Sequence, residues 1–106
     1  MSYTQIDRDE PLEGEVELWA VGTAGFPQFN HEWQEKVWLR LHPQTAKAIE
    51  YIRELEGLQG VSPVDGGLLW LFTTENEAIR AKNLMDAVGI KTGKQVGRVF
   101  ADAKQL

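Results

Sequence analysis

The sequence of 106 residues predicts a single α+β domain, and three observations carry that prediction. Hydrophobic residues make up 42% of the chain and charged residues 25%, both ordinary values for a globular protein. Stretches of alternating apolar and polar side chains, typical of strands, are interleaved with two stretches of helical periodicity. The chain has no cysteine, which excludes disulfides, thiolate metal sites and cysteine nucleophiles. A chain of this length can bury enough apolar surface to fold without disulfide bonds.

The first third of the chain divides into an arm and an irregular extension. Residues 1–14 are polar and acidic, which predicts a flexible arm. Residues 15–21 alternate apolar and polar side chains, so we expect an extra N-terminal strand there, placed at either edge of the sheet or in a hairpin with 37–41. Residues 22–34 combine turn-forming residues with aromatic ones, which predicts a loop that folds back and packs. The aromatic residues of this loop are Phe26, Phe29 and Trp33.

Residues 36–102 show the order strand, helix, strand, strand, helix, strand. An alternating stretch over 36–41 predicts the first of these strands. Pro43 suits the first turn of the following helix, where its missing N–H costs nothing. Gly57 and Gly89, each followed by an aliphatic residue, are expected to end the two helices in a left-handed conformation.

The second half of this order repeats the first. Residues 61–64 predict a short edge strand, because Pro63 cannot donate to a central ladder. A glycine-rich hairpin turn leads to 68–72, which is apolar throughout and predicts the most buried strand. Thr74 and Glu77 form a capping box for the second helix, with Thr73 as an alternative cap, and a last strand follows over 95–101. The strand order β-α-β-β-α-β predicts a ferredoxin-like sandwich, with two helices on one face of an antiparallel sheet and the extra strand added.

The apolar stretch 68–72 implies that the far face of the sheet is covered. Whichever way this strand faces, two or three large side chains lie opposite the helices. Three alternatives could cover this face: the chain's own residues 15–34, a second copy of the protein, or a ligand or different partner. We expect the interaction surface to comprise Trp38, Arg40, Leu69, Leu71 and Arg98. The cover, or the wall of a pocket, is expected to comprise Trp19, Phe26, Phe29 and Trp33.

The net charge of −5 is distributed unevenly. Residues 1–35 hold eight acids and one base, whereas residues 80–106 hold six bases and two acids. Overall acidity argues against a general affinity for nucleic acid. The start of the chain has no apolar run, and no stretch approaches the roughly 18 apolar residues that cross a bilayer. We therefore expect a soluble, cytoplasmic protein without a membrane partner.

No motif predicts catalysis or a cofactor. His31 and Glu35 would share a helix face and could ligate a metal, but no third strong ligand is placed near them. His42 precedes a proline at a helix start and lacks an identifiable partner carboxylate. Residues 91–94 end like a phosphate-binding loop, yet the upstream glycines are missing and a strand follows. We expect no metal, no cofactor and no catalytic residue.

The leading hypothesis is therefore a non-enzymatic protein-interaction or regulatory module, homodimeric in one version, that uses its sheet face or its acidic arm. One alternative is a small-ligand-binding or dimeric enzyme domain with a pocket between the sheet and loop 22–34. Another is binding of single-stranded nucleic acid through the sheet. The fold itself does not choose among these functions.

Overall fold

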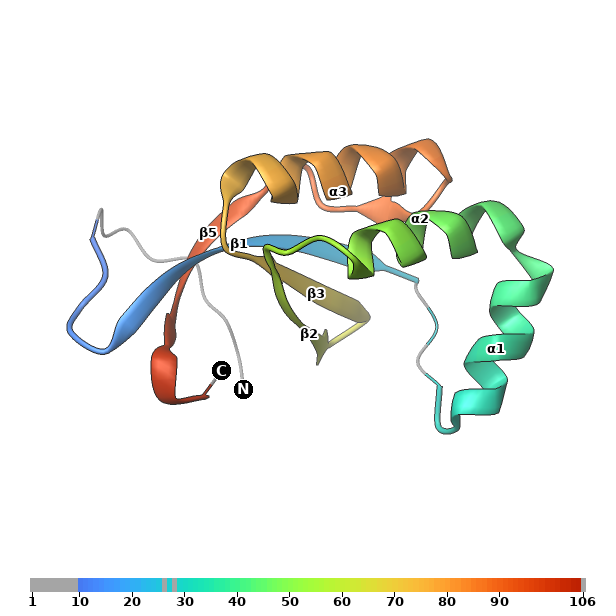
Figure 1. Ribbon diagram of the computed structural model, residues 1–106, viewed down its shortest axis with the longest axis horizontal. Coiled ribbons are helices and arrows are strands. Elements are labelled where there is room, and N and C mark those ends of the chain that lie inside the picture. The colour runs from blue at the N-terminus through green and yellow to red at the C-terminus, as the bar shows by residue number, and fades with distance from the viewer. Residues whose placement is uncertain (1–9, 26, 28, 106) are drawn as a thin grey trace.

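The computed structural model describes residues 10–25, 27 and 29–105, and within them the chain is an α+β protein (Figure 1). Five strands form one open antiparallel sheet, accompanied by three α-helices. The elements in chain order are β1 (Glu15–Ala24), α1 (Glu32–Leu41), α2 (Pro43–Arg53), β2 (Leu58–Val64), β3 (Gly67–Phe72), α3 (Glu75–Ala87), β4 (Lys91–Thr92), β5 (Gly97–Asp102) and a 3-10 turn, Ala103–Gln105.

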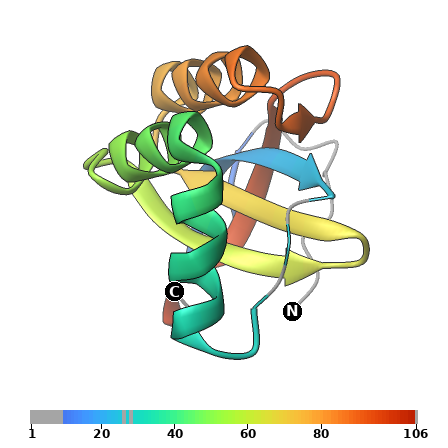
Figure 2. The ribbon, with the colours of Figure 1, turned by 90° about the vertical axis from the view of Figure 1, so that its right-hand side faces the viewer.

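The sheet has the order β2-β3-β1-β4, and β5 also pairs with β1. One edge of β1 pairs with β3, with Val21 opposite Trp70. The other edge of β1 pairs with β5 along its first part and with β4 at its end. Between β4 and β5 the chain moves away from β1, so the two short strands are separate. The two central strands, β1 and β3, are each followed by helix. α2 and α3 lie side by side on one face of the sheet (Figure 2).

One prediction about the first half of the chain is wrong and another is confirmed in part. The predicted strand 36–41 lies in helix α1. The predicted strand 15–21 is a strand, but it belongs to β1 at the centre of the sheet and is not an added element. The ferredoxin-like order built on 36–41 is therefore not confirmed. Apolar residues at every second position suggested a strand, but the segment is rich in Glu, Gln, Lys, Leu and Arg, which favour helix. These propensities, with apolar side chains four residues apart, outweigh the alternation.

The second half follows the prediction closely. β2 is an edge strand and β3 a buried one, joined by a tight turn in which Gly66 has φ +81°. Thr74 caps α3 by accepting the N–H of Glu77 at 3.3 Å. Gly89 has φ +86°, and the N–H of Ile90 closes the end of the helix onto the Met85 carbonyl at 2.9 Å. The turn predicted at 91–94 instead begins with the short strand β4.

Gly57 has a different role from the predicted left-handed stop. α2 ends earlier, at Arg53, and Gly57 is not among the glycines with positive φ. Its N–H donates to the Glu77 carboxylate at 2.9 Å, and a Cβ at this position would overlap that carboxylate. Glu77 thus joins the start of α3 to the turn before β2, and a larger residue at position 57 would displace its carboxylate from this hydrogen bond.

The helix-facing side of the sheet carries the main core. Side chains of β1 and β3 pack against α2 and α3, and Ile52, Phe72 and Met85 are completely buried among them. Within this core the indole N–H of Trp70 donates to the hydroxyl of Thr23 at 3.1 Å. The bond satisfies both buried polar groups, which would otherwise destabilise the fold.

The far side of the sheet carries a second cluster of apolar side chains. Leu18 is 1% exposed and Leu71 is 2% exposed, with Val99 and Ala101 of β5 packed beside them. β3 therefore divides its apolar residues between two faces, as its lack of polar alternation predicted. In the single chain this side of the sheet is closed at its centre.

Candidate functional site

Helix α1 stands apart from the rest of the molecule. It projects past the end of the sheet, and its main contact is with α2 (Figure 2). No residue of α1 is buried. Pro43 explains the break between the two helices, since a proline disfavours helical geometry in the residue before it. His42 accordingly has φ −130° and ψ 68°, so the chain turns there and α2 starts at Pro43.

The beginning of α1 is capped by its own side chains. The Gln34 side-chain oxygen accepts the N–H of Asn30 at 3.0 Å and that of His31 at 3.3 Å. The rings of His31 and Trp33 lie nearly parallel, with their centroids 6.4 Å apart. These contacts are local, so they define where the helix starts without joining it to the core.

One side of α1 rests on α2 through polar and aromatic contacts. Arg53 of α2 donates to Glu35 at 2.6 Å. Trp38 stacks on His42 with centroids 4.3 Å apart, and its backbone carbonyl lies 2.8 Å from the His42 Nδ1. The Phe29 ring lies beside the Trp38 ring at a tilt of 56°, with the two centroids 6.0 Å apart.

The opposite side of α1, which we call the outward face, consists of Trp33, Val37 and Leu41. These residues are four apart and therefore lie on one side of the helix. Their exposed fractions are 63%, 45% and 71%, so three large apolar side chains face solvent together. Lys36 and Arg40 lie along one border of this face. Lys36 approaches Glu32 at 3.8 Å, and Arg40 has no ion pair within the described part of the chain.

A cleft of about 420 Å³ opens beside the Trp38–His42 stack. Gly25 and Pro27, from the loop after β1, form a second wall, and the turn between α3 and β4 forms a third. Thr45, in the first turn of α2, and Lys91 also line the cleft, and no acidic residue does. A helix start and a lysine beside stacked rings can together receive an anion that carries a planar group.

The predicted interaction residues do not form one surface. Trp38 lines the cleft, whereas Arg40 borders the outward face. Leu71 is buried on the far side of the sheet, and Leu69 is partly buried beside it. Arg98 lies on β5, with its guanidinium 5.5 Å from the Phe100 ring.

The predicted cover residues are also dispersed. Trp19 packs at the margin of the helix-side core, Phe29 contacts Trp38, and Trp33 is exposed on α1. Phe26 lies outside the described residues. Sequence reasoning missed Val37 and Leu41 as site residues because it placed them in a strand, although their spacing from Trp33 was the available signal.

A polar cluster joins the end of α3 to β4. Lys82 donates to Asp86 at 2.8 Å and to Thr92 at 3.1 Å, and the Thr92 hydroxyl donates to Asp86 at 2.5 Å. The hydrogen bond from Lys82, followed by that from Thr92, lowers the pKa of Asp86 below its usual 3.8. Every member of the cluster has a partner within it, and the cluster links α3 to β4.

The described residues contain no group of three or more His, Asp or Glu side chains that could hold a metal. None of their helices combines the length and the apolar character needed to span a bilayer. Within them, no buried side-chain nitrogen or oxygen lacks a hydrogen-bond partner. No family model, no curated protein and no solved structure matches the chain.

Proposed function

We propose that this protein is a non-enzymatic interaction module that binds a partner protein through the outward face of α1. The observation that carries the proposal is a helix with no buried residue and three aligned, exposed apolar side chains. A helix of ten residues is marginal in water without tertiary packing. Fully burying a side chain of this size stabilises a complex by about 1.5–3 kcal/mol. Contact with a partner would therefore supply the packing that α1 lacks.

The border of the outward face indicates the chemistry of the partner. Arg40, which has no ion pair within the described part of the chain, favours an acidic surface. An antiparallel two-fold pairing of α1 with its own copy would place the Arg40 border of each helix on the same side of the contact, which opposes self-association through this face. We thus favour a different, acidic protein. The closed far side of the sheet, at Leu18 and Leu71, supports α1 over the sheet as the contact surface.

Site-specific photocrosslinking tests the proposal. A photoreactive phenylalanine derivative would replace Val37 in cells that make the protein, and Ile79 of α3 would be the control. The two residues are matched, being apolar, helical and 45% and 40% exposed. We expect a discrete crosslinked product from position 37, absent at position 79 and reduced by Arg40→Glu. Equal products at both positions, or none at 37, would contradict the proposal, whereas a product of twice the monomer mass would assign the face to a second copy.

We also infer that the sheet follows the ferredoxin-like plan in a shifted form, with β1 in place of the predicted strand 36–41. The order β2-β3-β1-β4, with β1 and β3 at the centre and α2 and α3 on one face, supports this inference. In this form α1 is the added element. An experimental structure with β1 at an edge of the sheet would contradict it.

The cleft beside the Trp38–His42 stack supports a second candidate function, binding of a small anion with a planar ring. The support is that the stacked rings, the start of α2 and Lys91 all line this cleft, and that no acidic residue does. Titration with aromatic carboxylates, followed by tryptophan fluorescence, would test it. Lys91→Glu should abolish a response that the control Lys94→Glu leaves intact. Silence across the series, or equal loss in both variants, would exclude this function.

A further inference from the structure

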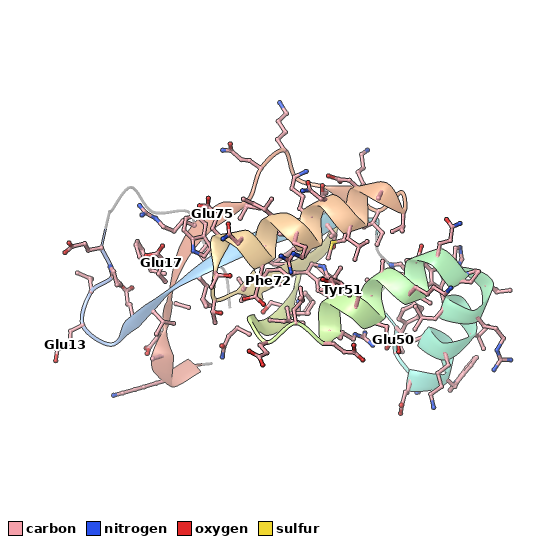
Figure 3. The ribbon with its side chains drawn as sticks, turned by 45° about the horizontal axis from the view of Figure 1, so that its top comes forward. Glu13, Glu17, Glu50, Tyr51, Phe72 and Glu75 are labelled. Carbon is pink, nitrogen blue, oxygen red and sulfur yellow. The ribbon has the colours of Figure 1, made fainter. Side chains whose placement is uncertain are left out.

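A second apolar surface lies on the helix side of the molecule, between α2 and α3. The two helices run side by side in opposite directions, and Tyr51 lies on the side of α2 that faces α3 (Figures 1 and 3). Ala48 of α2 and Ala87 of α3 are too small to close the space between the helix backbones. The result is an open groove of about 660 Å³ with Leu84 and Val88 on its α3 side.

The charges along this groove are all of one sign. Lys47 stands on the α2 wall and Arg80 on the α3 wall, and none of the lining residues is acidic. Elsewhere in the described chain, Lys36, Arg53 and Lys82 each approach a carboxylate. Neither Lys47 nor Arg80 has such an ion pair there. Arg40 is likewise without one, so what distinguishes the groove is that two such cations stand on its facing walls with no acid among the lining residues, in a protein of net charge −5.

The shape of the groove restricts what it can hold. It is open along its length, which suits an elongated macromolecular segment better than an enclosed small molecule. Its shorter wall, α2, has 11 residues and is therefore about 16 Å long. That length accommodates about three turns of a third helix. A helix lying there would have a cation on each side and an apolar floor beneath it.

We propose that the α2–α3 groove binds an acidic amphipathic helix of a partner protein. Its apolar stripe would pack on Tyr51 and Leu84, and acidic side chains on its two borders would meet Lys47 and Arg80. This site is separate from the outward face of α1 and does not depend on it. Charge complementarity favours an acidic helix over a basic or a neutral one as the occupant of the groove.

Two synthetic peptides of about 18 residues, long enough to form helices, serve as probes. They share the same leucine stripe and differ only in their polar face, which is Glu in one and Lys in the other. Fluorescence anisotropy of the labelled peptides measures their dissociation constants. The net charge of the protein alone would favour the Lys peptide. The proposal predicts the reverse order, with the Glu peptide bound at least about tenfold more tightly.

Matched variants locate the binding. The double variant K47E/R80E should weaken the Glu peptide by about tenfold or more. The double variant K94E/K104E changes the net charge equally at two exposed lysines outside the groove, and it should leave that affinity within about twofold. Ala87→Phe fills the groove without changing charge and should also abolish binding. Thermal unfolding confirms that each variant is folded.

Three results would overturn the proposal. They are stronger binding of the Lys peptide, equal losses in the two charge variants, and unchanged binding in folded Ala87→Phe. Binding of anionic lipid vesicles without binding of the Glu peptide would also overturn it. The α1 variant Val37→Glu should not affect the Glu peptide, so failure here and failure of the α1 proposal are separate outcomes.

Discussion

Helices α1 and α2 are consecutive, nearly equal in length and both amphipathic, yet they have opposite relations to the core. α2 buries Ala48, Ile49 and Ile52 against the sheet, whereas α1 buries nothing. The difference lies in position, because α2 crosses the face of the sheet and α1 projects beyond its end (Figure 2). An apolar stripe thus tells where a helix can be buried, and the surrounding topology decides whether the same chain buries it.

The largest expected effect is the difference in unfolding free energy between a substitution in α2 and one in α1. Ile52→Ala should lower the free energy of unfolding by about 2–5 kcal/mol, because it leaves a cavity in a completely buried site. Leu41→Ala, at an exposed position on α1, should change it by less than about 0.5 kcal/mol. Urea denaturation measures both values. Similar losses in the two variants would show that α1 belongs to the core.

The next effect concerns the polar contact inside that core. Thr23→Val should cost about 1–3 kcal/mol, since it leaves the buried indole N–H of Trp70 without its acceptor. Thr23→Ser keeps the hydroxyl and is the matched control for this contact. If both variants unfold at the same urea concentration, the hydrogen bond makes no net contribution.

Removal of the helix caps should have a smaller effect on stability and compares the starts of α3 and α1 directly. Thr74→Ala removes the cap of α3 and should cost about 1 kcal/mol, because α3 unfolds only with the core. Gln34→Ala removes the reciprocal capping contact of α1, in which a side chain inside the helix accepts the N–H groups of Asn30 and His31, and it should affect local helix content by circular dichroism more than global stability. A larger global loss from Gln34→Ala than from Thr74→Ala would reverse the comparison.

The smallest expected effect is pH-dependent and concerns the Asp86 cluster. Because the folded protein lowers the pKa of Asp86, the ionised carboxylate stabilises the fold above the usual value of 3.8. The difference in stability between the natural protein and Asp86→Asn should be constant near neutral pH. It should disappear as the pH falls from about 3.8 through the lower folded pKa. Urea midpoints measured across this range, with Asp65→Asn as control, test the sign.

The sequence predicted the second half of the fold more accurately than the first. Gly66, Thr74 and Gly89 act through local backbone chemistry, so their roles were readable without tertiary information. The segment from Lys36 to Leu41 fits both the two-residue period of a strand and the period of a helix. Because it was predicted as a strand, the real central strand, β1, was assigned as an added one. The contact of Glu77 with Gly57 joins residues far apart in sequence, which no local pattern reveals.

The candidate site was less predictable than the fold. Apolar residues on both sides of β3 were inferred correctly, but the sequence did not indicate that the far side would be closed in the single chain. The outward face of α1 combines Trp33, which was singled out, with Val37 and Leu41, which were placed in a strand. The basic groove needs α2 and α3 side by side, because Lys47 and Arg80 are 33 positions apart in the chain.

Native-state hydrogen exchange of the isolated protein tests the central claim most directly, by comparing the amides of α1 and α2. If α1 obtains its packing from outside the chain, its amides should exchange through local opening, at a free energy well below that of global unfolding. The amides of α2 around Ile49 and Ile52 should exchange near the global value. Equal protection of the two helices would contradict the claim.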